Sequence, residues 1–200
     1  MYIKKILVLS ICGFLFFGCT SQNKPNKKIM AQNEVVTNPT IQSNSNLDQA
    51  SEWLVNYDEV YKKSVQENKP ILANFTGSDW CGWCKKLKKA VFDTETFKRW
   101  ANENVVLFEL DYPRRTPQDP AIKRQNAELQ QTFRGLVRGY PTVLIFDIER
   151  ELQADGTKSQ DKIKIHGQRM GYMPDPQSFI NTAKTNLQNR NQKIKDNMGG

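Results

Sequence analysis

The apolar residues of the chain fall into distinct zones. Residues 6–17 form a nearly continuous apolar run, residues 20–50 contain almost no large apolar side chain, and residues 70–147 are rich in them. A core forms only where such side chains are dense, because their burial must offset the conformational entropy lost on folding. The pattern therefore predicts an N-terminal leader, a disordered polar tether over 20–50, one folded domain over 51–189 and a flexible tail over 190–200.

Within the folded domain, the spacing of apolar residues changes between helical and strand-like periods. Helices are predicted at 58–68, from 81 onward with a second piece after 93, at 122–133 and from 176 onward; strands are predicted at 71–75, 105–110, 142–146 and 162–166. Asp58 and Asp175 are the expected caps of the first and last helices. This order of elements predicts an α/β domain with a mixed central sheet and helices on both faces.

The N-terminal run has the features of an export signal. Lys4 and Lys5 precede the apolar residues 6–17, which have about the length of a signal core. The alternative is a buried N-terminal helix, but this run has no polar face and a polar tract follows it. We therefore expect residues 1–19 to direct export, which places the domain on the periplasmic or cell-surface side.

The end of the leader resembles a bacterial lipoprotein signal, in which a small residue precedes a cysteine that becomes lipidated. Gly18 and Cys19 match that pattern, whereas Phe16 replaces the usual leucine. The alternative is ordinary cleavage, or an uncleaved leader, with an incidental Cys19. Because a cysteine at this junction has no other evident use, we expect Cys19 to carry the lipid that anchors the domain to a membrane.

The charge balance narrows the possible partners. The chain of 200 residues has a formal net charge of +8, which is compatible with attraction to anionic surfaces. No basic segment is interleaved with aromatic residues, so nucleic acid is not an expected partner. A solvated lysine-rich surface is the simpler explanation of the charge, and we expect a monomer.

The cysteines point to chemistry rather than to a structural role. Cys12 and Cys19 lie in the leader, and Cys81 and Cys84 lie two residues apart. A disulfide-stapled scaffold would scatter more cysteines through the domain. A structural zinc site needs about four ligands, which one cysteine pair and His166, the only histidine, cannot supply. No metal is therefore expected, and the pair is either reactive or incidental.

The segment Trp80, Cys81, Gly82, Trp83, Cys84 is predicted at a junction of strand, turn and helix. The free amides and the dipole at a helix start stabilise a thiolate. The first cysteine can be exposed there and attack, and the second, one turn in and shielded, can resolve. The glycine allows close approach, and the tryptophan rings can shield the pair and present a docking surface. Two small core residues that meet by chance are the alternative, which this context disfavours.

With these residues the sequence resembles the thioredoxin superfamily, and most closely an exported bacterial branch with a Trp-Cys-Gly-Trp-Cys motif. The segments that carry the resemblance are residues 69–72, 75–84 and 139–142, together with 111–114, Asn126 and 171–172. It extends over about residues 52–188. The resemblance implies a thioredoxin-like fold, a thiol–disulfide oxidoreductase whose redox centre is the dithiol, and no dissociable cofactor.

The resemblance also assigns roles outside the cysteine motif. It implies a cis Tyr140–Pro141 bond against the cysteine pair, with backbone groups that bind substrate, whereas the residues alone suggest a trans proline that opens a strand. In the family a buried aspartate precedes a phenylalanine, and a lysine often lies near it. Here Asn74 precedes Phe75 and the neighbouring position is Leu107, so both charges are absent. Resolution is then expected to depend on water or another proton acceptor.

Three other polar residues are weaker candidates for a functional role. His166 lies in an alternating strand and is predicted to be an exposed pairing residue rather than a base. Arg114 and Arg115 form either an anion or partner site or an inert solvated loop, and we expect the loop.

Two functions follow from this sequence. The first is an exported oxidoreductase for protein disulfides, a reductase or isomerase, because the domain resembles the electron-accepting domains of exported reducing pathways. Such an enzyme needs a membrane protein as electron donor. The second is a thioredoxin-fold binding or chaperone module whose dithiol is idle or senses oxidants.

Overall fold

The computed structural model describes residues 52–151 and 161–198, all within one compact unit, Asn44–Gly200. The leader, the tether and Cys19 lie outside the described residues. In chain order the elements are α1 (Tyr57–Glu67), β1 (Ile71–Thr76), α2 (Gly82–Leu87), the π-helical turn η1 (Lys88–Phe92), α3 (Glu95–Asn104), β2 (Val106–Asp111), α4 (Pro120–Thr132), β3 (Thr142–Glu149), β4 (Lys162–Met170) and α5 (Pro176–Met198).

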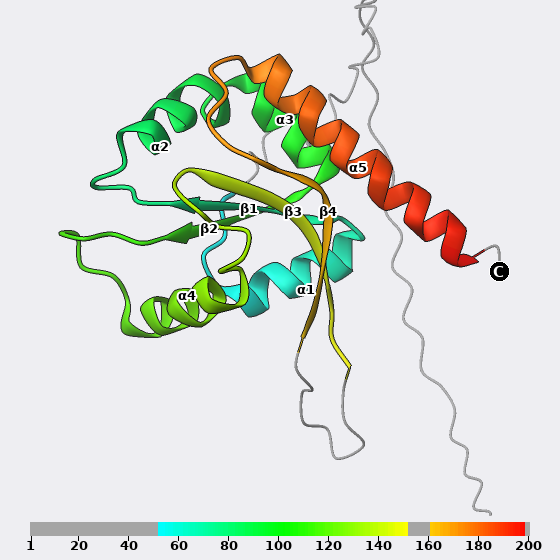
Figure 1. Ribbon diagram of the computed structural model, residues 1–200, viewed down its shortest axis with the longest axis horizontal. Coiled ribbons are helices and arrows are strands. Elements are labelled where there is room, and N and C mark those ends of the chain that lie inside the picture. Colours follow the sequence, from blue (N-terminus) through cyan, green and yellow to red (C-terminus); the bar gives the residue numbers. More distant parts are fainter. Residues whose placement is uncertain (1–51, 152–160, 199–200) are drawn as a thin grey trace, which may run out of the picture. The chain divides into compact units, whose positions relative to one another are not determined.

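The four strands form one mixed sheet in the order β2-β1-β3-β4 (Figure 1). β1 runs parallel to β2 and antiparallel to β3, and β4 returns antiparallel to β3. Every residue of β1 is buried, as expected of a central strand covered on both faces. The thioredoxin-like α/β fold predicted from the sequence is therefore confirmed.

Helices cover both faces of the sheet and divide the core into two layers (Figure 1). Leu72, Leu107 and Ile145 pack with side chains of α2, η1, α3 and α5 on one face. Alternate residues of the same strands, such as Phe75 and Phe108, pack with α1 and α4 on the other. The alternation follows from the two-residue period of a strand, and it decides which side chains can lie beneath α2.

The helix ends follow local capping chemistry, with one correction. Asn56, and not Asp58, caps α1: its side-chain oxygen accepts hydrogen bonds from the N–H groups of Asp58 at 3.0 Å and Glu59 at 3.1 Å. Asn56 lies directly before the helix, where a cap is needed, whereas Asp58 already belongs to its first turn. Asp175 caps α5 as predicted, and its carboxylate accepts the Ser178 N–H at 2.6 Å.

The last helix differs from the sequence prediction. Residues 190–198, expected to be part of a flexible tail, continue α5 to Met198. Arg190 ties this part of the helix to the sheet, because its Nε donates to Asp147 Oδ2 at 2.8 Å. A charged side chain in a polar stretch gave no sign of this long-range partner.

His166 is a second correction, because it is buried with only 4% exposure. Its Nε2 lies 2.8 Å from Asp147 Oδ2, the oxygen that also accepts from Arg190. Two strand positions away the chain is clamped to α5: Asn186 accepts the Gln168 N–H at 3.0 Å and donates to the Gln168 carbonyl at 2.9 Å. The long C-terminal helix therefore covers the strand face that the alternation pattern left open to solvent.

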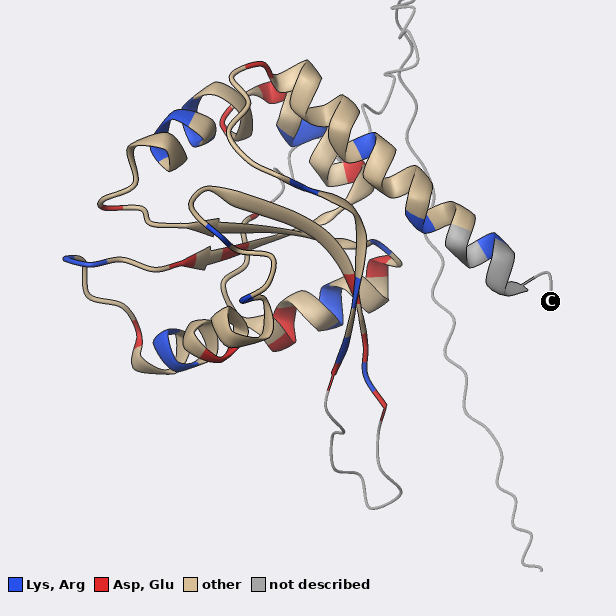
Figure 2. Ribbon diagram, viewed as in Figure 1, with Lys and Arg blue, Asp and Glu red and all other residues tan. Residues whose placement is uncertain are grey.

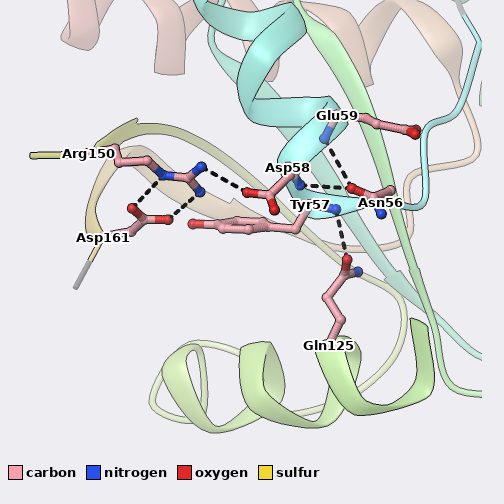
Figure 3. A network of polar contacts seen from close by, with 7 residues as sticks. All are labelled: Asn56, Tyr57, Asp58, Glu59, Gln125, Arg150 and Asp161. Atoms are coloured by element: carbon pink, nitrogen blue, oxygen red, sulfur yellow. Dashed lines mark hydrogen bonds and ion pairs between the residues drawn. The ribbon is translucent and has the colours of Figure 1, made fainter. Parts of the chain in front are cut away.

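A charged network joins elements at one end of the sheet (Figure 3). The Arg150 guanidinium forms two hydrogen bonds with Asp161, at 2.8 and 2.7 Å, and a third with Asp58 at 2.8 Å. The N–H of Tyr57 donates to Gln125 Oε1 at 2.8 Å and connects α4 to the same cluster. The network thus joins α1, α4 and the ends of β3 and β4.

Among the described residues, no helix has the length and hydropathy needed to span a membrane.

Candidate active site

The cysteine pair lies where β1 gives way to α2, as predicted. The strand ends at Thr76, the chain turns, and the helix begins at Gly82 with Cys81 as its N-cap. Cys81 and Cys84 form a disulfide with an S–S distance of 2.05 Å. The Cys81 sulfur also accepts a hydrogen bond from the Cys84 N–H at 3.1 Å. A sulfur atom therefore occupies the capping position that Ser or Asp side chains usually fill.

The expected contrast in exposure between the two cysteines is absent in the disulfide form. Each cysteine is 5% exposed. The capping hydrogen bond explains this correction, because it directs the Cys81 sulfur back over the first helical turn instead of outward. The pair still differs in its electrostatic surroundings, since only the Cys81 sulfur receives the first-turn N–H.

The helix start favours negative charge on the Cys81 sulfur. Unpaired N–H groups and the helix dipole place partial positive charge at this end, and η1 continues the helical segment to Phe92. Lys85 and Lys86 in α2 add positive charge nearby. When the disulfide is reduced, these groups would favour the thiolate over the thiol at Cys81.

Trp80 forms one wall of the site. Its ring lies so close to Gly77 that a Cβ there would approach the ring to 2.3 Å. The indole N–H donates to the Tyr112 carbonyl at 2.8 Å, and the ring meets Tyr140 edge-on with centroids 5.5 Å apart. Two of the predicted site residues, Trp80 and Tyr140, are thus brought together. The Tyr140–Pro141 bond is cis, as the resemblance implies.

Trp83 forms a second wall and is 55% exposed. Its ring lies 4.9 Å from that of Tyr172, and Lys86 Nζ lies 4.3 Å from its centroid. At the remaining predicted residue, Gly82, an added Cβ would meet no described atom within 4 Å, so the space beside it is open. Gly82 is exposed in the first turn of α2.

The loop after β2 is anchored to the site by Asp79, which sequence reasoning had not singled out. The Asp79 carboxylate accepts hydrogen bonds from the N–H groups of Arg114, Arg115 and Thr116 at 2.6 to 3.1 Å. This anchor places the Arg114 guanidinium 3.8 Å above the Trp80 ring. The loop expected to be inert therefore contributes a cation to the wall of the site.

The Asp79 anchor should depend on pH. Desolvation alone would raise the pKa of this carboxyl, but the N–H groups of Arg114, Thr116 and Arg115 lower it from 3.8 to about 2. Because the folded pKa is the lower one, the carboxylate stabilises the loop above about pH 4 and loses that effect as the pH falls through 2. Amide chemical shifts of residues 114–116 should titrate with a midpoint near 2. The Asp79→Ala variant should show no such titration, and a midpoint near the ordinary value would contradict the anchor.

Beneath α2, the residues next to the cysteine pair differ from the sequence prediction in one respect. Asn74 is 5% exposed, and its Oδ1 has no hydrogen-bond partner among the described residues. Its register partner on β2 is Glu109, whereas Leu107 pairs with Leu72. A carboxyl group is therefore present beside Asn74 after all. The register was not predictable because it is set by packing between segments about 35 residues apart.

Glu109 lies in surroundings that favour its protonated form. Burial raises its pKa and the nearby Asp111 carboxylate raises it further, while Lys88 acts in the opposite direction. Lys88 follows Cys84 by one helical turn, so it lies on the same side of the helix as Cys84.

Within the described part of the chain, no group of three or more His, Cys, Asp or Glu side chains could hold a metal ion.

Known proteins share both the fold and the motif region. A family model described as thioredoxin-like matches residues 52–147. The disulfide bond reductase DsbH of Chlamydia pneumoniae is 30% identical over 141 residues, which span 68% of this chain and 80% of DsbH. The thioredoxin-related protein DsbJ of Chlamydia pneumoniae is 29% identical over 147 residues, 72% of this chain but 42% of DsbJ. A solved structure of a DsbH oxidoreductase aligns with a TM-score of 0.55 at 26% identity, over 80% of this chain and 95% of that chain.

The fold and the paired cysteines together define a thiol–disulfide oxidoreductase. The chain belongs to the thioredoxin-like family.

Proposed function

We propose that this protein is an exported disulfide reductase in which Cys81 attacks protein disulfides and Cys84 resolves the intermediate. The observation that carries the proposal is the hydrogen bond from the Cys84 N–H to the Cys81 sulfur at the start of α2. It gives the two sulfurs unequal surroundings and favours the thiolate at the first position. The identity with a disulfide bond reductase supports the reducing direction.

The reaction takes place in two exchanges. The Cys81 thiolate attacks one sulfur of a substrate disulfide, forms a mixed disulfide and releases the other substrate sulfur as a thiolate. The Cys84 thiolate then attacks the Cys81 sulfur and releases the second substrate thiolate. Two electrons have passed to the substrate, and the enzyme is left with the Cys81–Cys84 disulfide that the structure contains.

The other site residues support these exchanges. Trp80 and Tyr140 on one side and Trp83 on the other form the aromatic surface against which a substrate chain rests. The backbone at Pro141 is the part that would pair with that chain. No cofactor beyond the dithiol takes part, and an external dithiol, supplied by a membrane electron donor, restores the reduced state. The leader and Cys19 would hold the domain at the outer side of a membrane.

The direction of the reaction is tested by a reduction potential together with an activity assay. We expect the chain to accelerate insulin reduction by dithiothreitol and to have a potential below about −180 mV, toward thioredoxin and away from the strong oxidant DsbA. Protein alkylated with iodoacetamide after reduction is the control. A potential near −120 mV would overturn the reducing direction. Equal activity of the alkylated protein would favour a binding module with an idle dithiol.

The Asn74→Asp substitution should speed the second exchange. An amide cannot accept a proton, whereas an aspartate on the sheet face covered by α2 can take the Cys84 proton. The neighbouring Glu109 carboxyl would repel a second negative charge, and so it would raise the pKa of one of the two carboxyls toward neutral pH. We expect release of a thiol from a preformed mixed disulfide on Cys81 to rise by about threefold to tenfold near pH 7, as measured by stopped flow.

The Asn74→Asp/Glu109→Gln variant is the matched control for that experiment. It keeps the new aspartate and removes its neighbour, so its rate maximum should move to lower pH. Unchanged release in a well-folded Asn74→Asp protein would show that position 74 is not where a proton acceptor is missing.

A further inference from the structure

A pocket opens beside the cis proline on the surface of the domain. It has a volume of about 370 Å³ and is formed by two segments, residues 138–142 before and within β3 and residues 169–171 at the end of β4. Pro141 and Thr142 lie at its base, where both are buried. Arg138 and Arg169 form its rim, and both are exposed.

Two aromatic contacts place this pocket next to the disulfide. Tyr140, which lines the pocket, meets Trp80, the residue before Cys81, with ring centroids 5.5 Å apart. Tyr172, which follows the second pocket segment, meets Trp83, the residue before Cys84, at 4.9 Å. The two loops that form the pocket therefore bracket the cysteine pair. A substrate chain at the disulfide would extend into the pocket within a residue or two of its own cysteine.

The rim arginines have no carboxylate partner in the described residues. Arg169 donates one N–H group to the Leu136 carbonyl at 3.2 Å and forms no ion pair with the described acids. Arg138 forms no ion pair with the described acids. An arginine presents five donors in a planar fork that matches a carboxylate. Two such forks at one rim constitute a receptor for a negatively charged group.

The carboxylates at this end of the sheet are already engaged. Asp79 accepts the N–H groups of the loop after β2, and Asp111 accepts the N–H and hydroxyl of Ser78 at 2.8 and 2.6 Å. Figure 2 shows basic residues of α2 and of the loop between β2 and α4 at this same end. Arg114 lies above Trp80 and acts electrostatically on Tyr140. Basic side chains therefore lie on more than one segment around the disulfide.

We propose that the pocket selects substrates that carry an acidic residue next to the cysteine to be reduced, with Arg138 and Arg169 binding its carboxylate. The inference rests on the proposed function and adds a substrate class to it. A pocket of about 370 Å³ beside the cis proline has room for an acidic side chain of a bound peptide. An anionic membrane surface would instead require a broad basic face.

The test compares three disulfide-linked peptides that differ only beside the cysteine, where they carry two glutamates, two glutamines or two lysines. Rates with the reduced protein are divided by the rates with free dithiothreitol, which removes the effect of neighbouring charge on the peptide cysteine. We expect the glutamate peptide to be reduced about tenfold faster than the glutamine peptide at low ionic strength. The lysine peptide should be slowest, and the ratios should shrink in about 0.5 M salt.

Substitutions at the rim decide whether the pocket causes the preference. Arg138→Gln and Arg169→Gln should each lower the glutamate-to-glutamine ratio about threefold, and the double variant should bring it near one. The Arg138→Glu/Arg169→Glu protein should prefer the lysine peptide. Arg99→Gln, an exposed arginine of α3 outside the pocket, is the control and should keep the wild-type ratio.

Several outcomes would overturn the proposal. Equal normalised rates for the three peptides with the wild-type chain would remove the preference, and a preference that survives the double glutamine variant would place its origin elsewhere. Arginine variants that lose binding to phosphatidylglycerol vesicles while keeping the peptide ratios would assign the arginines to a membrane surface. If no peptide is reduced, the proposed function fails, and this inference fails with it.

Discussion

Replacing Cys81 with serine is expected to lower the rate of disulfide reduction by at least about a thousandfold, because the attacking thiolate is lost. Cys84→Ser should have a different result, since the first exchange needs only Cys81. The Cys84→Ser protein should accumulate mixed disulfides that nothing within the site resolves. Insulin turnover measures the first effect, and mass spectrometry of non-reduced protein from cells measures the second.

The two serine variants are matched controls for each other, because each changes one sulfur to oxygen within the same helical turn. Adducts should therefore appear on Cys84→Ser and be absent from Cys81→Ser. The full chain also contains Cys12 and Cys19, so adduct sites are located by peptide mapping. Equal trapping on both variants would contradict the assignment of attacking and resolving roles.

Arg150→Met is expected to lower the free energy of unfolding by about 3 kcal/mol. The Arg150 side chain is only 7% exposed and the Asp161 side chain 17% exposed, so water does not replace the lost ion pair. The guanidinium also lies 4.1 Å from the centroid of the Tyr61 ring. Its removal takes two charge-assisted hydrogen bonds away from Asp161 at the junction of α1, β3 and β4 (Figure 3). Urea unfolding of the full chain measures the change.

Two further variants separate charge from packing at this position. Arg150→Met/Asp161→Leu removes both charges and should recover part of the loss, because removing one charge of a buried ion pair costs more than removing both. Arg150→Lys keeps the charge but cannot form the planar double hydrogen bond, so its loss should be smaller than that of Arg150→Met. A double variant as unstable as the single one would show that aromatic packing, and not the ion pair, stabilises this junction.

Local signals in the sequence were sufficient for most of the fold. Residues 71–75 and 142–146 are apolar enough to predict central strands, and Asp175 followed by Pro176 predicts the start of the last helix. The segment from Cys81 onward was expected to be helical, and the structure continues it through η1 to Phe92. These features depend on residues that are close in the sequence, within one or two helical turns, and local sequence patterns therefore predict them.

The features that sequence reasoning missed depend on contacts between distant segments. His166 looks exposed in its strand, but the turn of α5 that carries Arg190 covers it together with Asp147. Glu109 looks like the polar position of an alternating strand, and only the register of β1 and β2 shows that it stands beside Asn74. The anchoring of Arg114 depends in the same way on Asp79, which precedes it by 35 residues.

The Cys81 sulfur that caps α2 couples the stability of the fold to the oxidation state of the cysteine pair. In the disulfide the capping atom is an uncharged, weak acceptor, whereas in the thiolate it would carry a full negative charge toward the same N–H group. The helix start thus has a different free energy in the two oxidation states. By thermodynamic linkage, any difference in folding free energy between oxidised and reduced protein equals nF times the shift of the dithiol potential from that of the unfolded chain. Paired unfolding curves would therefore measure what folding contributes to the dithiol potential without any substrate.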